Sequence, residues 1–175
     1  TKVLINHGLT PQEIFFYRFL IAYIGIWAIS PKHLFADNLK DELWLVAGGV
    51  FGGSLYFFTE NTALGITQAS NVAFIICTAP LLTTILSLLF YKSEKATKGL
   101  IYGSLLALIG VGLVVFNGSV VLKLSPVGDL LTLLAALSWA FYSLVIKRMT
   151  GRYPTVFITR KIFFYGVLTI LPAFL

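Results

Sequence analysis

The chain has 175 residues, of which 58% are hydrophobic and only 11% charged, and its formal net charge is +6. A soluble domain is usually about half apolar and carries about a quarter charged residues. This apolar excess is too large for a bigger core to absorb, so we predict a membrane protein rather than a soluble enzyme or binding domain. Cys77 is the single cysteine, which leaves neither a disulfide framework nor a cysteine-based metal site.

Six apolar runs follow one another along the chain, each close to the 20 or so residues that a spanning helix needs. They cover residues 11–30, 43–64, 68–91, 98–118, 127–147 and 154–175. Every backbone polar group inside hydrocarbon must be satisfied within its own segment, so these runs are predicted to be α-helices. The predicted fold class is therefore an all-α polytopic membrane protein with six transmembrane helices in this chain.

The connections between the runs fall into two sets if the runs alternate across the membrane. Segments 31–42, 92–98 and 147–153 hold eight lysines and arginines, whereas the other connections hold two. The positive-inside rule therefore predicts that these three segments are cytoplasmic. The apolar runs imply the lipid bilayer as a partner. No basic face carries interleaved aromatic residues, so we expect no nucleic-acid partner.

Two helix starts are alike, namely "TPQEIFFYRF" at 10–19 and "YPTVFITRKI" at 153–162. Each has a proline where a helix begins and a basic residue seven positions later, Arg18 in the first and Lys161 in the second. The offset spans five helices, which is an odd number, so the two copies should have opposite orientations in the membrane. This pattern predicts an inverted repeat, as is common in secondary transporters.

Three stretches carry a family resemblance: "TPQEIFFYRFL", the run from "LYFFTENTALG" to "LLALIGVGLVV", and "GDLLTLLAALSWAFYSLVIKR". In order and spacing they resemble the EamA family of the drug/metabolite transporter superfamily. The resemblance implies ten helices in two inverted five-helix repeats around a central substrate cavity. Residues 1–126 would then be the first repeat without its first helix, and residues 127–175 the start of the second.

The resemblance implies a secondary transporter in the plasma membrane that exports small metabolites or amino acids by alternating access. No phosphate-binding loop for ATP is present in the sequence, and we expect no cofactor. The alternatives are a membrane-embedded enzyme acting on lipid and a membrane scaffold without transport activity. The enzyme would need acids or histidines clustered at one interface, but His7 and His33 fall on opposite sides of the predicted topology.

Glu60 and Arg18 are ionisable residues inside predicted helices, which makes them candidates for substrate binding or proton coupling. Arg18 lies about 10 Å from the outer end of its helix and Glu60 about 9 Å from the outer end of the next. We therefore predict that the two side chains meet, directly or through one water. The pair could serve only to hold the bundle together, or it could also bind cargo.

Tyr56 and Glu60 continue a helical spacing that begins at Gly49 and Gly53, which predicts one face that packs closely against a neighbouring helix or borders a cavity. Trp139 lies near the middle of its helix, away from both interfaces, and is therefore a candidate for the cavity wall.

Four polar or helix-breaking positions complete the candidate site. Asn61, Asn71 and Thr78 could bind substrate, although an amide near the outer turn could instead cap a helix. Pro80 interrupts its helix and would form either a static kink or a hinge. Lys161 lies toward the cytoplasmic side and is expected to extend to the membrane surface or to pair with a helix outside this chain.

Overall fold

The computed structural model describes residues 8–29, 34–91, 97–116 and 125–174, and all regular structure in these ranges is helical. The first three helices are α2 (Pro11–Ile29), α3 (Leu39–Gly49) and, after the π-helix η1 (Val50–Ser54), α4 (Leu55–Ile66). They are followed by α5 (Ala69–Ile76), α6 (Ala79–Phe90), α7 (Lys98–Phe116), α8 (Pro126–Thr150), α9 (Thr155–Ile170) and the short 3₁₀ helix η2 (Leu171–Phe174).

The six predicted runs match these elements to within four residues at the described ends, with α3, η1 and α4 forming one run and α5 and α6 another. Three of the runs are helices long and apolar enough to cross a membrane, namely Gln12–Ile29, Ala69–Phe90 and Pro126–Thr150. The all-α class is confirmed for the described residues. The number of six spans and the inverted repeat stay predictions.

Local side-chain contacts explain where two of the helices begin. At the start of α2 the Thr10 hydroxyl accepts from the Glu13 N–H, while Glu13 accepts from the Thr10 N–H at 2.8 Å, which is a capping box. At the start of α3 the Asn38 side chain accepts from the Asp41 N–H at 2.8 Å. These contacts satisfy amide groups that have no partner inside the helix.

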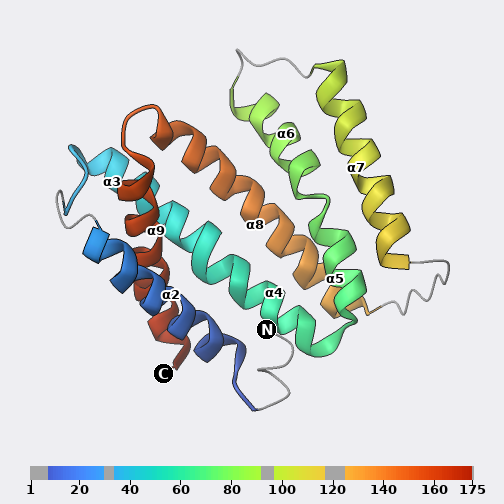
Figure 1. The fold of residues 1–175 in the computed structure, drawn as a ribbon, viewed down its shortest axis with the longest axis horizontal. Helices are drawn as coiled ribbons and strands as arrows, with labels where there is room; N and C mark the ends of the chain where they lie inside the picture. Colours follow the sequence, from blue (N-terminus) through green and yellow to red (C-terminus); the bar gives the residue numbers. More distant parts are fainter. Residues whose placement is uncertain (1–7, 30–33, 92–96, 117–124, 175) are drawn as a thin grey trace.

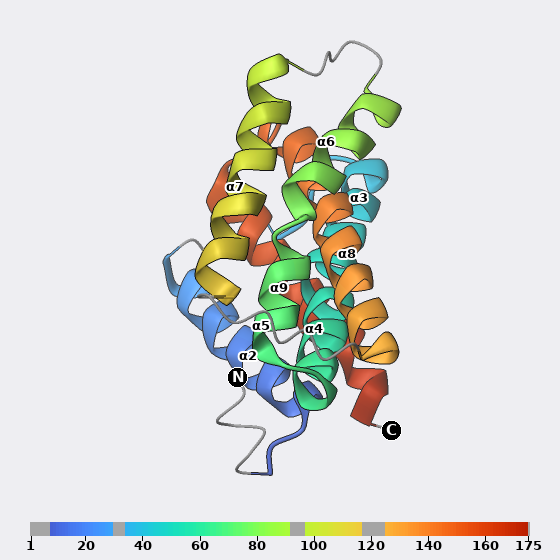
Figure 2. The same ribbon diagram turned by 90° about the vertical axis from the view of Figure 1, so that its right-hand side faces the viewer.

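Helix α8 lies in the middle of the assembly and packs against α3, α4, α5 and α6 (Figure 1). Helix α9 packs against α2, α3 and η1, and it runs in the opposite direction to α2. In Figure 2 the long axes of α5, α6, α7 and α8 point in a common direction. Helix α7 lies at the edge of this group. Among the described residues, the larger of two buried clusters joins α3, α8 and α9 through side chains such as Leu45, Met149 and Ile158.

The π-helix η1 was not predicted from the sequence, and side chains of α8 and α9 contact it. Its wider turn is visible in the Leu55 N–H, which bonds to the Val50 carbonyl five residues earlier. The Ser138 hydroxyl of α8 donates to the Phe51 carbonyl at 2.7 Å. The hydroxyls of Ser54 and Thr169 are 2.8 Å apart and link η1 to α9.

The glycines before and within η1 allow α9 to approach closely. A methyl group added to Gly49 would lie 3.0 Å from the Gly166 backbone nitrogen, and one added to Gly53 would lie 3.1 Å from the Gly166 Cα. Close helix packing through small residues is therefore observed on this face. Tyr56 does not lie on this glycine face against α9. Its ring instead packs against Trp139 of α8, with the ring centres 4.9 Å apart. The wider π turn changes the helical spacing between Gly53 and Tyr56.

Pro80 lies at the start of α6, where the predicted interruption of the helix is observed. Helix α5 ends at Ile76, and the Thr78 hydroxyl donates to the Ile75 carbonyl at 2.7 Å. The Thr84 hydroxyl donates to the Pro80 carbonyl at 2.9 Å. These bonds stabilise the kink within the helix itself, and a role for Pro80 as a hinge stays a prediction.

Candidate functional site

A cavity of about 500 Å³ lies between α2, η1, α4, α8 and α9. Aromatic rings form much of its wall: Phe19, Phe57, Trp139, Tyr142 and Phe163. The charged and hydroxyl side chains of its described lining are those of Arg18, Thr159 and Tyr142. The volume is within the range of small-molecule sites, about 300–1,000 Å³. The arrangement therefore suits a small ligand with an apolar body and few polar groups.

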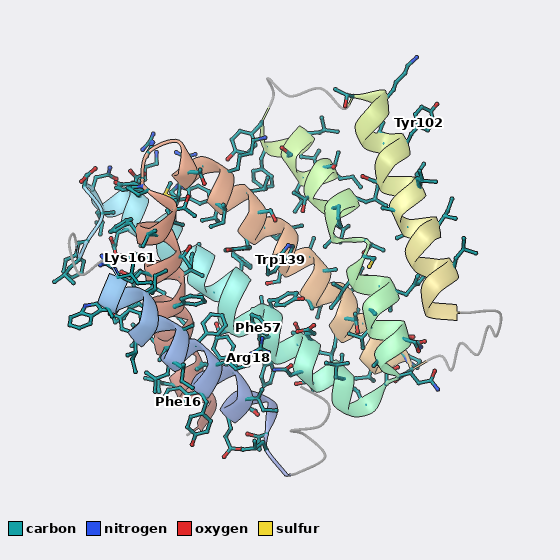
Figure 3. All side chains as sticks on the ribbon, in the orientation of Figure 1. Phe16, Arg18, Phe57, Tyr102, Trp139 and Lys161 are labelled. Carbon is teal, nitrogen blue, oxygen red and sulfur yellow. The ribbon has the colours of Figure 1, made fainter. Side chains whose placement is uncertain are left out.

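Arg18 brings the only charge to the described lining of this cavity. It lies on α2, its side chain is exposed, and its guanidinium carbon lies 5.4 Å from the centre of the Phe57 ring. Figure 3 shows Arg18, Phe57 and Trp139 following one another across the space from α2 toward α8. At this distance the ring and the guanidinium form a cation–π contact.

The aromatic wall opposite α2 is a connected set of rings. Trp139 lies with its ring centre 4.9 Å from Tyr56 and 5.0 Å from Tyr142. Tyr142 in turn covers Gly52, where an added methyl group would overlap its ring. Trp139 is 38% exposed, so part of its ring remains open to the cavity. The rings of Tyr56, Trp139 and Tyr142 therefore pack against one another on this side of the cavity.

Glu60 lies on α4, about one turn beyond Phe57, and is half-buried. It accepts a hydrogen bond of 3.5 Å from the Tyr56 hydroxyl. Arg18 is near enough to interact with it electrostatically, yet the described residues contain no Arg18–Glu60 ion pair within 4 Å. The predicted direct contact is therefore not formed. A contact through one water stays a prediction.

The remaining predicted polar residues lie outside the lining of this cavity. Asn61 is fully buried on α4, and Asn71 is buried in the first turn of α5. The Thr78 hydroxyl is engaged with its own helix segment. A substrate-binding role for these three residues stays a prediction. Gln68 occupies the N-cap position of α5, but its side chain makes no capping hydrogen bond.

A second polar cluster lies where α3 meets α8 and α9, and it was not predicted from the sequence. We call it the latch: it consists of Asp41, Glu42, Arg152, Tyr153 and Lys161. Arg152 donates two hydrogen bonds to Asp41, at 2.9 and 3.0 Å, and the Tyr153 hydroxyl donates a third at 3.0 Å. Lys161 forms an ion pair with Glu42, to which the hydroxyl of Tyr165 also donates.

The expectation for Lys161 was wrong. Its side chain is only 4% exposed and is paired within this chain, so it neither extends to the surface nor waits for an external helix. The ring of Phe35 adds a cation–π contact at 4.7 Å. A buried ammonium group needs such a carboxylate partner because its desolvation is costly. The only signal in the sequence was that segments 31–42 and 147–153 were assigned to the same side of the membrane.

Asp41 is almost completely buried although it lies in the first turn of its helix. Burial acts to raise the pKa of its carboxyl group. Hydrogen bonds from Asn38, Arg152 and Tyr153, together with the charge of Arg152, outweigh that effect and hold the pKa below its ordinary value. Asp41 is therefore ionised at neutral pH, and the latch carries a full negative charge at this point.

Comparison of the sequence with known proteins shows the family. Residues 1–116 match the model of the EamA-like transporter family. The chain is 32% identical over 149 residues to "Uncharacterized transporter YdfC" of Bacillus subtilis (strain 168), covering 83% of this chain and 47% of that protein. It is 27% identical over 168 residues to an "Uncharacterized transporter" of Archaeoglobus fulgidus, covering 94% of this chain and 57% of that protein.

A third relative, an "Uncharacterized transporter" of Clostridium kluyveri, is 25% identical over 181 residues, covering 97% of this chain and 57% of that protein. No solved structure matches the chain. The chain spans about half the length of the curated relatives it matches. It is an integral membrane protein that belongs to the EamA-like transporter family.

Proposed function

We propose that this chain is part of a secondary transporter that exports small metabolites or amino acids across the plasma membrane by alternating access. The observation that carries the proposal is the cavity of about 500 Å³ between α2, η1, α4, α8 and α9. Its walls come from both proposed repeats, since residues 1–126 supply α2, η1 and α4, and residues 127–175 supply α8 and α9. A site between two repeats is exposed to either side when one repeat rocks against the other.

The latch supports the alternating-access part of the proposal. It joins the start of α3, in the first proposed repeat, to the α8–α9 turn and to α9, in the second proposed repeat. By the distribution of basic residues this is the cytoplasmic end of the helices. Two ion pairs across the repeat boundary would keep that end closed. Opening toward the cytoplasm would then require both pairs to separate, as in a gate.

Glu60 is the proposed site of proton coupling. Its carboxyl group lies on α4 close to the cavity wall, with Tyr56 as its hydrogen-bond donor, and within electrostatic reach of Arg18. A carboxyl group in such a place could gain and lose a proton as the cavity opens to one side and then the other. The membrane potential or a proton gradient would then drive transport.

The experiment that tests the function uses the full-length protein, because this chain covers only part of its relatives. The protein is reconstituted in proteoliposomes, loaded with a panel of unlabelled metabolites and amino acids, and assayed for uptake of the matching labelled compound. We expect saturable counterflow for at least one compound, because alternating access exchanges bound cargo in both directions. Absence of counterflow across the panel, or uptake that never saturates, would argue against a transporter of this kind.

A further inference from the structure

We propose that the cavity binds a monocarboxylate with a flat, apolar body, and that Arg18 binds its carboxylate. This inference rests on the proposed transport function and names the class of cargo. It starts from the balance of charge. The described lining holds one cation, Arg18, and no acidic side chain, and no carboxylate lies within 4 Å of Arg18 among the described residues. Glu60 lies outside this lining and within electrostatic reach of Arg18 but forms no ion pair with it within 4 Å, so a carboxylate of the ligand can be the direct partner of the arginine.

The chemistry and placement of Arg18 fit a carboxylate. Its guanidinium carbon lies over the Phe57 ring, 5.4 Å from the ring centre, and this cation–π contact holds the side chain at the cavity. A guanidinium carries five N–H donors that point outward in its plane, and no carboxylate of the described residues lies within 4 Å of those of Arg18. A carboxylate accepts two parallel N–H groups from such a fork, which gives both binding energy and direction. Lysine, as a point charge, cannot provide the same geometry.

The rest of the cavity fits an apolar body rather than a polyol. Trp139, Tyr142 and Phe163 provide ring surfaces. Thr159 is the one aliphatic hydroxyl in the described lining, and it donates to the Thr155 carbonyl at 2.9 Å in its own helix. A sugar would leave several of its hydroxyl groups without partners here, and each unmade hydrogen bond of a buried hydroxyl group weakens binding. A flat ring stacked against the aromatic wall avoids that cost.

The same charge balance disfavours two other kinds of ligand. A dianion such as a phosphate monoester would bring a second negative charge, which no further cation of the described lining compensates. A free amino acid would bring an ammonium group to a lining without an acidic side chain, since Glu60 lies outside the described lining and accepts a hydrogen bond from Tyr56. The phosphodiester of an anionic lipid shares the features of one negative charge and an apolar body. The experiment must therefore separate a soluble carboxylate from a lipid.

The test measures binding to the full-length protein in nanodiscs of zwitterionic lipid, with phenylacetate, phenylacetamide, phenethylammonium and L-phenylalanine as probes. Quenching of tryptophan fluorescence and thermal shift are the readouts. We expect phenylacetate to bind at least tenfold more tightly than each of the other three. In Arg18→Gln this preference should disappear, and in Arg18→Lys part of it should remain. The matched control is Arg148→Gln, since Arg148 stacks on Trp44 away from the cavity, and it should keep the full preference.

Three results would overturn the inference: equal binding of phenylacetate and phenylacetamide, tighter binding of phenethylammonium or phenylalanine, or an unchanged preference in Arg18→Gln. Loss of phenylacetate binding when phosphatidylglycerol is added to the nanodiscs would identify a lipid site and would overturn it as well. Counterflow of another compound without any carboxylate preference would leave the proposed function standing and remove only this inference. Tight carboxylate binding without counterflow would support this inference and argue against the proposed transport function.

Discussion

Arg152 and Asp41 are 111 residues apart in the sequence, yet the Arg152 guanidinium donates to both carboxylate oxygens of Asp41, at 2.9 and 3.0 Å. The Asp41 side chain is 2% exposed, whereas that of Arg152 is 52% exposed. The carboxylate therefore depends on its partners much more than the arginine does. This pair holds the start of α3 against the turn between α8 and α9, and it is the best-defined link between the two proposed repeats.

Replacement of Asp41 tests the latch. Asp41→Asn keeps the shape of the side chain but removes the charge that Arg152 and Tyr153 recognise. We expect the free energy of unfolding to fall by about 1–2 kcal/mol, as for hydrogen bonds to charged groups of which one partner remains hydrated. Chemical denaturation of the full-length protein in detergent measures the change. Asp37→Asn is the control, because Asp37 is exposed. Equal stability of the two variants would contradict the proposed role of Asp41.

The latch should also have a defined pH dependence. The pKa of Asp41 is lower in the folded protein than its ordinary value of about 3.9. The unfolded chain therefore takes up a proton first as the pH falls, and the stabilisation by ionised Asp41 is lost as the pH drops through the folded-state pKa. The stability difference between wild type and Asp41→Asn should be constant from about pH 8 to 5 and should decline below about pH 4. A decline already at pH 6 would show that another group titrates.

The sequence predicted the helices because their boundaries depend on local features. The apolar runs marked the spans, and Pro11 and Pro154 marked two helix starts. It could not predict the latch, because the Lys161–Glu42 pair forms only when α9 and α3 lie side by side. Nor could it predict η1, whose wider turn depends in part on a bond from Ser138. The predicted direct contact between Arg18 and Glu60 is not formed, because a matched depth in the membrane does not determine the direction in which two side chains point.

The glycine face gives a prediction about packing. Gly49→Ala would place a methyl group 3.0 Å from the Gly166 backbone nitrogen and against Tyr165, which would push α9 away from α3. We expect a loss of about 1–3 kcal/mol in the free energy of unfolding, as for other overpacked sites. Gly25→Ala on α2 is the matched control, because nothing lies within 4 Å of the added methyl group. Thermal unfolding should show a lower midpoint for Gly49→Ala only. Similar midpoints for both variants would contradict the close approach of α9.

Proton coupling through Glu60 predicts a specific kinetic change. Glu60→Gln keeps the hydrogen bond from Tyr56 but cannot exchange a proton. In proteoliposomes we expect gradient-driven transport to fall at least tenfold, while counterflow, which needs no net proton movement, persists. Glu13→Gln is the control, since a glutamine at that position can still complete the capping box at the start of α2. If Glu60→Gln transports like wild type at every pH, Glu60 is not the coupling group.

If cargo crosses through the cavity between α2, η1, α4, α8 and α9, filling that cavity with a large side chain should block transport. Ala22 lies in its lining, and Ala107 lies on the exposed face of α7. Counterflow by the full-length protein in proteoliposomes is compared for Ala22→Trp and Ala107→Trp at equal amounts of folded protein. We expect Ala22→Trp to reduce counterflow at least tenfold and Ala107→Trp to leave it unchanged. Undiminished counterflow by Ala22→Trp would contradict this route.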